Sequence, residues 1–389
     1  MAARELKLGT FLTPAGEHIA AWRHPSVPAK GGTDFEALCA IATIAEAGKL
    51  DFLFAGDVSP NSDLPPDMLR RSSWLDKLDP LTVLSAVAAR TDRIGLIGTA
   101  TTTYGEPYSL ARRFASLDHV SRGRAGWNVV TSMNHTDAAN FGRAEHDPLT
   151  ERYKRAEEFV HVARGLWDCW DDGAFTRDKE SGFYVETAAL PRLDHAGKFF
   201  RVRGPMDQPR PPQGHPVIVI AGASDEGRDL AARAADLVFS SQQSLGSAQA
   251  FYADIKARAA KAGRRPDEIL VLTGFHPIVA DSESAAREKF AGLQALLHPS
   301  VALSMLTTLL GGVDLSRFPF DEPLPPLPPA KGLTSRRDML VALAKREGWT
   351  LRQLALHVAG SRGHPVVIGT GATVADDMEN WFRQGGADG

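Results

Sequence analysis

Cysteine is scarce in this 389-residue chain, which contains only Cys39 and Cys169. Neither has a second cysteine close in sequence, so the chain offers no CxxC redox pair and no cysteine-based metal knuckle. We expect both to be small buried apolar residues. The histidines show no HExxH or HxH spacing and no GxSxG turn occurs, so we expect neither a metal site nor a serine hydrolase.

An excess of charge of one sign and long apolar runs are also missing. Lys plus Arg total 44 against 47 for Asp plus Glu, which gives a formal charge of −3 and no general attraction to nucleic acid or anionic lipid. No stretch approaches the roughly 20 apolar residues that span a bilayer, and the N-terminus lacks the apolar core of a signal peptide. We therefore expect a cytoplasmic protein without nucleic-acid or membrane partners.

The chain does contain regularly alternating elements. Short apolar runs alternate with helical patterns over most of its length, which is typical of βα units around a parallel sheet. Seven strands are predicted, at residues 6–12, 52–57, 94–103, 125–132, 216–224, 237–241 and 269–279. This number, with helices between the strands, favours an α/β (β/α)₈ TIM barrel over an open doubly wound sheet.

Two of the intervening helices have clear signals. Asp79 and Pro80 are typical of an N-cap and first turn, and Leu81, Leu84 and Val87 follow on one face. A second helix is predicted from about residue 150, with one apolar stripe made of Tyr153, Ala156, Val160, Ala163 and Trp167.

Two stretches do not follow the repeat, namely residues 171–214 and 298–364. Because βα units resume after the first, we interpret both as insertions on a single barrel domain that spans residues 1–389. Near the end, Gly369 and Gly371 resemble a dinucleotide-binding turn. The third glycine position holds Val374 and only 15 residues follow, so we do not interpret this segment as a nicotinamide site.

Polar residues at the carboxyl ends of barrel strands face the active site, and four predicted strands end in such residues: Asp57, Thr103, Asn128 and Ser224. Gly222 and Ser224 lie between an apolar strand and a helix. Free N–H groups, a hydroxyl and a glycine there suit a phosphate monoester, although Ser224 could equally just cap the helix. Asp57 could hold a ligand or cap the next loop, and Tyr153 could be a core residue.

At these strand ends the sequence resembles the flavin-dependent monooxygenases of the bacterial luciferase-like superfamily, in particular the nitrilotriacetate and dibenzothiophene sulfone monooxygenase branch. The segments that carry the resemblance are residues 11–25, 51–58, 97–104, 106–114, 123–132, 152–159 and 221–228. Together they cover the barrel from its first strand to its fifth.

The resemblance implies an FMN site in the barrel mouth. Asp57, Thr103, Tyr153 and Ser224 match flavin-binding positions of the branch, with Tyr153 and Ser224 at the phosphate and Asn128 and Gly222 nearby.

The resemblance also implies roles for two histidines, one in catalysis and one in flavin binding. His18 matches a histidine that related long-chain alkane monooxygenases require, so it is the candidate catalytic residue. Many relatives have a flavin-contacting histidine where this chain has Leu149, and His146 is the candidate replacement.

The activity implied is that of the oxygenase component of a two-component system. Reduced FMN, supplied by a separate NAD(P)H:flavin reductase, would react with O₂, and one oxygen atom would enter a small organic substrate. The implied assembly is a homo-oligomer, either dimer or tetramer. An F420-dependent oxidoreductase of the same superfamily is the alternative.

The substrate class is argued from the loops. Phe11, Leu12 and Trp22 make the first loop apolar, which favours an apolar or aromatic sulfur compound or another xenobiotic. Arg70 and Arg71 in the long second loop instead favour an aminopolycarboxylate.

One departure from the family concerns the C-terminus. Relatives continue beyond Ala387–Gly389 into an eighth strand, so we expect this strand to be missing from the chain.

Overall fold

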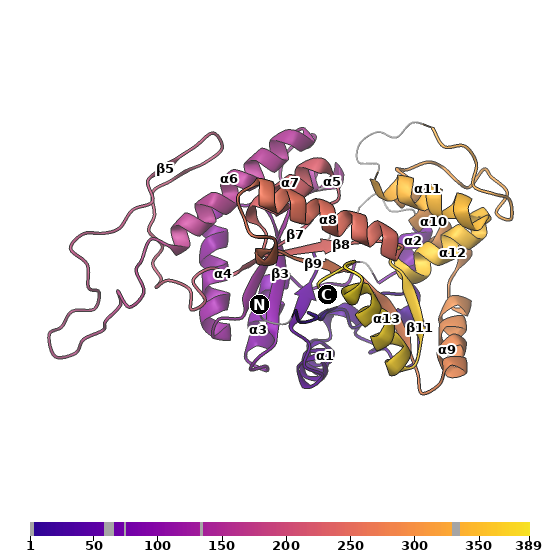
Figure 1. Ribbon diagram of the computed structural model, residues 1–389, viewed down its shortest axis with the longest axis horizontal. Helices are drawn as coiled ribbons and strands as arrows, with labels where there is room; N and C mark the ends of the chain where they lie inside the picture. The colour runs from indigo at the N-terminus through magenta and orange to yellow at the C-terminus, as the bar shows by residue number, and fades with distance from the viewer. Residues whose placement is uncertain (1–3, 58–65, 74, 133–134, 329–334) are drawn as a thin grey trace.

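A curled sheet of seven parallel strands forms the centre of the computed structural model, which describes residues 4–57, 66–73, 75–132, 135–328 and 335–389 (Figure 1). The spatial order follows the sequence: β1 (Gly9–Phe11), β2 (Phe52–Ala55), β3 (Gly95–Thr101), β4 (Ala125–Val130), β7 (Val217–Ala221), β8 (Leu237–Ser240) and β9 (Leu270–Thr273). Each neighbouring pair is parallel. The predicted TIM-barrel-type fold is therefore confirmed.

Helices between the strands cover the outside of this sheet: α1 (Phe35–Ala47), α3 (Pro80–Ala88), α4 (Pro107–Ser121), α6 (Leu149–Trp167), α7 (Asp225–Ala234) and α8 (Leu245–Lys261). Local signals set where they begin. The Asp79 carboxylate accepts a hydrogen bond from Thr82 N at 2.8 Å, and Pro80 is the first residue of α3. Both predicted helices are confirmed, including the buried face of α3.

The main core lies between these helices and the sheet. Trp127 of β4 packs between Phe114 of α4 and Phe159 of α6, with both ring-centroid separations at 5.6 Å. All three side chains are fully buried, and the Trp127 indole N–H donates to the Ala100 carbonyl. This packing fixes α4 and α6 against β3 and β4, and so positions the carboxyl ends of those strands.

The predicted strand 269–279 is wrong in one respect, because it forms two strands. β9 ends at Thr273, and β10 (His276–Val279) leaves the barrel sheet to pair with β11 (Val366–Gly369) in a separate parallel pair. Gly274 lies at the break. A Cβ there would come within 2.6 Å of the His364 ring, so the close crossing of the two segments requires glycine.

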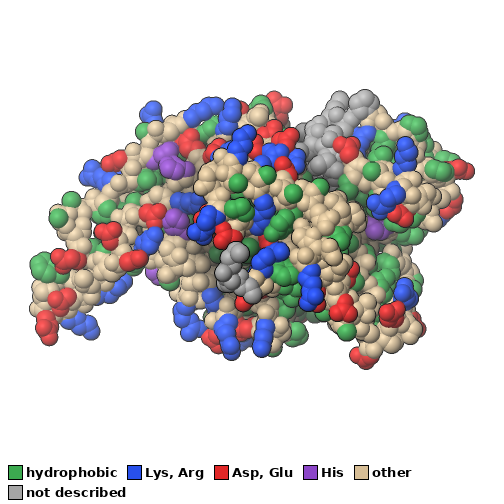
Figure 2. Space-filling view, viewed as in Figure 1, with side chains coloured by type: hydrophobic (Ala, Val, Ile, Leu, Met, Phe, Trp, Pro, Cys, Tyr) green, Lys and Arg blue, Asp and Glu red, His purple; other side chains and the backbone are tan. Residues whose placement is uncertain are grey.

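The two insertions differ in structure. Residues 171–214 contain only the antiparallel pair of β5 (His195–Ala196) and β6 (Arg201–Val202), and they project from the body at the left of Figure 1. Figure 2 shows this extension carrying acidic and basic side chains in alternation.

The second insertion is helical, with α10 (Pro299–Leu309), α11 (Ser335–Glu347) and α12 (Leu351–Ser361). These helices and α2 (Pro66–Arg71) share a second apolar cluster with Ile19 and Ala20 of the first loop. Arg70 and Arg71 therefore lie on a short helix and not in a loop.

The remaining helices with their bounds are η1 (Ala21–Arg23), η2 (Gly31–Thr33), α5 (His135–Asn140), η3 (Pro266–Glu268), α9 (Glu283–Ala295) and α13 (Gly371–Arg383). Within the described residues no single helix is long and apolar enough to cross a membrane. Only α9 and α10 taken together, with an 88° bend between them, reach the length and composition of one span.

Residues 387–389 lie between β9 and β1, the two outer strands of the sheet. Lys7 N donates to the Asp388 carbonyl at 3.0 Å, and Thr273 N donates to the Gly389 carbonyl at 2.9 Å. The Asp388 carboxylate is buried against Lys256 and Arg4. Burial alone would raise the pKa of Asp388, but the Val271 N–H and the two cations outweigh it and lower that pKa. The described residues form no eighth strand, so the expectation about that strand stays a prediction.

The two cysteines are unpaired thiols. Cys39 is buried in α1 as expected. For Cys169 the expectation is wrong, because it lies just after α6 and is only half-buried, with its thiol donating to the Gly165 carbonyl.

Candidate active site

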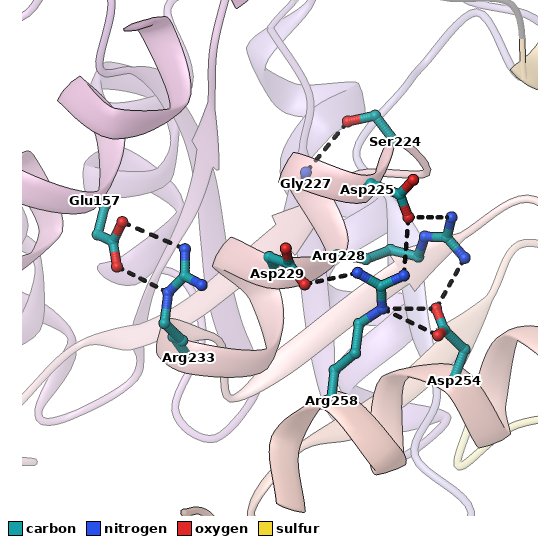
Figure 3. A network of polar contacts seen from close by, with 9 residues as sticks. All are labelled: Glu157, Ser224, Asp225, Gly227, Arg228, Asp229, Arg233, Asp254 and Arg258. Atoms are coloured by element: carbon teal, nitrogen blue, oxygen red, sulfur yellow. Dashed lines mark hydrogen bonds and ion pairs between the residues drawn. The ribbon is translucent and has the colours of Figure 1, made fainter. Parts of the chain in front are cut away.

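Three of the candidate residues meet at the N-terminus of α7. Ser224 is the N-cap residue, and its hydroxyl accepts a hydrogen bond from Gly227 N at 3.2 Å (Figure 3). A Cβ built on Gly227 would lie 2.9 Å from the Tyr153 hydroxyl and 3.3 Å from the Ser224 hydroxyl. A Cβ on Gly222 would lie 3.0 Å from the Gly227 Cα. The two glycines therefore allow close packing here, with the Tyr153 hydroxyl of α6 and the Ser224 hydroxyl both lying against the first turn of α7.

Ion pairs hold α7 against the following helix, as Figure 3 shows. Arg258 of α8 contacts Asp225 at 2.8 Å, Asp229 at 2.6 Å and Asp254 at 3.0 Å. Arg228 also contacts Asp225, at 2.9 Å. Hydrogen bonds to Asp229 and Asp254 raise the pKa of Arg258 further above its ordinary value. Because two guanidiniums compensate Asp225, the first turn of α7 keeps the positive character of a helix N-terminus.

The other side of α7 is joined to α6. Arg233 near the end of α7 pairs with Glu157 of α6 at 2.8 Å (Figure 3). Glu157 lies one helical turn after Tyr153, so this pair helps to hold the helix that bears Tyr153 beside α7.

Asn128 lies opposite Thr99 in the register of β4 with β3. Its amide nitrogen donates to the Thr99 hydroxyl at 2.9 Å, and its side chain is buried. Its carbonyl oxygen is also buried and accepts no hydrogen bond from the residues that the structure describes. Leaving a buried carbonyl unpaired costs about 1–3 kcal/mol, so this oxygen is suited to accept an N–H or O–H from a ligand.

Threonines join the ends of β3 and β4. The Thr101 and Ser132 hydroxyls are 2.9 Å apart, and Ser132 N donates to the Thr103 hydroxyl at 3.2 Å. The Thr103 O–H is thus free to donate at the strand ends. Arg155 of α6 donates to the Thr102 carbonyl at 3.1 Å, so the helix that carries Tyr153 is tied to the same strand.

Asp57 follows β2 and is open to solvent. Although part of its side chain contacts solvent, the surrounding chain partly desolvates the Asp57 carboxylate and so raises its pKa. The nearby cation Lys77 opposes this rise. Burial in turn lowers the pKa of Lys77, which is also solvent-exposed. Both shifts are typical of side chains on the walls of an open depression.

His18 is buried, with only 2% of its surface exposed. Its Nδ1 accepts a hydrogen bond from Ala20 N at 3.1 Å, and its ring meets Phe290 edge-on at 6.4 Å. Nε2 is buried and unpaired within the described structure; Gln294 lies close by without completing a hydrogen bond. Burial, with the nearby His276 adding to it, lowers the pKa of His18 to about 4. The imidazole is therefore neutral at pH 7.

His146 lies in the loop before α6, where its Nδ1 is 2.6 Å from the Tyr104 hydroxyl. Tyr104 stacks on Phe141 with ring centroids 4.4 Å apart. The structure thus places His146 against the side chain of Tyr104, three residues beyond the end of β3. Among the described residues no group of three or more His, Cys, Asp or Glu could hold a metal ion.

Sequence reasoning did not single out three residues of this site: Gly227, Lys77 and Thr99. Only Gly227 had a recognisable signal, because glycine is unfavourable inside a helix relative to alanine by about 1 kcal/mol. Thr99 and Lys77 become relevant through strand register and loop packing, which no local pattern encodes.

Comparison with known proteins gives a consistent result. The model of the luciferase-like monooxygenase family matches residues 15–389. N-acetyl-S-(2-succino)cysteine monooxygenase of Bacillus subtilis (strain 168) is 46% identical over 99% of this chain and 87% of its own length. Nitrilotriacetate monooxygenase component A of Aminobacter aminovorans is 46% identical over 100% of this chain and 87% of its own.

More distant relatives extend the comparison. Dibenzothiophene-sulfone monooxygenase of Rhodococcus erythropolis is 37% identical over 99% of this chain and 87% of its own length. The crystal structure of DmoA from Hyphomicrobium sulfonivorans superposes with a TM-score of 0.87 at 32% identity, and the match covers 99% of this chain and 82% of that one.

Proposed function

This chain belongs to the luciferase-like monooxygenase family, and from that premise we propose that it is the oxygenase component of a two-component, FMNH₂-dependent monooxygenase. The observation that carries the proposal is the N-terminus of α7, which the Ser224 and Tyr153 hydroxyls flank. Its N–H groups, the Ser224 hydroxyl and the Tyr153 hydroxyl are all donors that suit a phosphate dianion. FMN carries such a phosphate, and the residues present fit it.

The barrel interior supports the same cofactor. The unpaired Asn128 carbonyl can accept an N–H of a flavin ring, and Thr103 can donate a hydroxyl to it. Asp57, whose pKa is raised, can hold a ring N–H or a ribityl hydroxyl. His146 approaches the same strand end through Tyr104. Reduced FMN would supply the activation of O₂, which no side chain can perform.

His18 is proposed to orient the substrate. With its pKa lowered to about 4, the ring is neutral at pH 7 and has little imidazolium to give as an acid. Nδ1 is occupied by Ala20 N, so Nε2 carries the proton and can donate one hydrogen bond.

A separate NAD(P)H:flavin reductase is proposed as the source of FMNH₂. The relative named nitrilotriacetate monooxygenase component A supports the presence of a second component. A homo-oligomeric state and a cytoplasmic location stay predictions.

For the substrate we propose a small organic sulfur compound or another xenobiotic. The apolar first loop supports this, and the relatives named for a succinocysteine derivative and for dibenzothiophene sulfone act on sulfur compounds. The relative named for nitrilotriacetate supports an aminopolycarboxylate as the second candidate.

The test uses the purified chain with FMN, a flavin reductase and NADH, under air and under nitrogen. We expect oxygenated product only under air, with one atom of ¹⁸O₂ in the product by mass spectrometry. Oxidation of NADH by this chain alone would contradict the two-component assignment. Turnover of reduced F420 under nitrogen would favour the deazaflavin alternative.

A further inference from the structure

A cavity of about 160 Å³ lies between η1, α2 and the first turn of α10. It shares no residue with the proposed flavin site, although Trp22, Arg70 and Arg71, from which the substrate class was argued, line it. We infer that this cavity binds a small organic acid through its carboxylate groups. Neither flavin nor oxygen enters this inference, so it can be tested separately from the proposed function.

The charge around the cavity is of one sign. Arg23, Arg70 and Arg71 line it together with His298, and among the described lining residues there is no Asp or Glu. Within the part of the chain that the structure describes, none of these arginines forms an ion pair, in contrast to Arg258, which contacts three carboxylates. The Arg70 and Arg71 guanidiniums, which have no carboxylate partner among the described residues, and that of Arg23, which donates to the Leu296 carbonyl, create a local attraction for anions in a chain with a net charge of −3.

The N-terminus of α10 adds to this field. His298 caps the helix by accepting a hydrogen bond from Ser300 N at 3.3 Å, and Pro299 is its first residue. An 11-residue helix carries a partial positive charge at this end. The helix end and the arginines therefore favour the same kind of ligand.

The floor of the cavity is apolar and rigid. Ile19, Ala20, Leu297 and Val301 line it, and all four belong to the buried cluster around α10 and α12. Trp22 stands at the rim, where its indole N–H donates to the carbonyl at the end of α2 at 2.9 Å. An occupant with a hydrocarbon part covers this floor, whereas a bare inorganic ion leaves it in contact with water.

The size of the cavity limits the ligand further. Sites for drug-sized ligands usually occupy roughly 300–1,000 Å³, so this cavity suits a molecule of a few carbon atoms. Arginine forks bind planar carboxylates in a bidentate manner. A short dicarboxylate or tricarboxylate satisfies both the charged walls and the apolar floor.

The experiment is calorimetric titration of the flavin-free protein with succinate, citrate and inorganic phosphate at one ionic strength. We expect saturable binding of both organic acids and at least tenfold weaker binding of phosphate. The double variant Arg70→Gln with Arg71→Gln should weaken citrate binding at least tenfold. The matched control is Arg93→Gln with Arg201→Gln, which removes the same charge at exposed arginines that line no part of the cavity; its citrate affinity should be unchanged.

Three results would overturn the inference: no saturable binding of either acid, phosphate binding as tight as citrate, or an equal loss in the two double variants. All four arginines are exposed, so both variants should melt at the temperature of the parent chain. Arg23→Gln provides an independent check from η1, and it should also weaken citrate binding severalfold.

Discussion

The replacement Gly227→Ala tests the proposed phosphate site most directly. Gly227 is the third residue of α7, and the added methyl group would come 2.9 Å from the Tyr153 hydroxyl and 3.3 Å from that of Ser224. The methyl group would therefore displace the Tyr153 hydroxyl, which is proposed to donate to the phosphate. We expect FMN affinity to fall at least tenfold, which corresponds to about 1.4 kcal/mol.

The effect on folding should be small, because two contributions oppose each other. Alanine stabilises a helix interior relative to glycine by about 1 kcal/mol. Against this, the methyl group at Gly227 would lie 3.1 Å from the Gly222 backbone and would displace the end of the Tyr153 side chain. The flavin-free variant should therefore unfold within about 1 kcal/mol of the parent chain.

The assay is an anaerobic titration of reduced FMN and of reduced riboflavin, followed by flavin fluorescence. Riboflavin lacks the phosphate, so its affinity should not change in Gly227→Ala. The control variant is Gly292→Ala in α9, where a Cβ would meet nothing within 4 Å. That variant should gain about 1 kcal/mol in stability and bind FMN as the parent does. Unchanged FMN affinity, or equal losses for FMN and riboflavin, would place the phosphate elsewhere.

Three further predictions concern single side chains. Ser224→Asp keeps a competent N-cap but sets a carboxylate against the phosphate, so titration should show FMN affinity reduced at least tenfold, about 1.4 kcal/mol. The melting temperature of the flavin-free protein should stay nearly unchanged. Equal FMN affinity in the variant and the parent would contradict the proposed phosphate site. The pKa of His18 is lowered to about 4, so the unfolded chain binds a proton between pH 6.5 and 4 that the folded chain does not, and stability is lost as pH falls through that window. Urea unfolding of the parent and of His18→Gln should show that this loss, on the order of 3 kcal/mol, is absent from the variant. Asp388→Asn removes a buried partner of Lys256 and should cost about 3 kcal/mol in the same assay, whereas Asp92→Asn at an exposed pair should cost less than about 1 kcal/mol.

The parts of the fold that the sequence could predict are those with local signals. The strands before Asp57 and Ser224 and the start of α3 at Pro80 are marked by apolar runs and capping residues within a few positions. These signals act within one element, so they can be recognised without knowledge of what packs against it.

The errors concern contacts between distant segments. The break at Gly274 depends on His364, ninety residues later, because the two segments cross too closely for a side chain. The half-exposed position of Cys169 depends on the insertion that follows α6. The helical state of Arg70 and Arg71 depends on packing of α2 against α10, which the loop composition does not reveal.

The candidate site likewise combines residues that local sequence signals mark with contacts between distant segments. These long-range contacts determine the charge at the site. From sequence alone the first turn of α7 could bind phosphate or could simply be capped by Ser224, and Asp225 and Glu226 place negative charge beside that serine. Arg258, which follows more than thirty residues later on α8, contacts Asp225 at 2.8 Å and offsets the charge of that carboxylate (Figure 3). Tyr153 arrives from α6 on the opposite side and adds a donor. We therefore propose that this helix end holds a dianion through tertiary contacts, and that the capping serine only marks where those contacts meet.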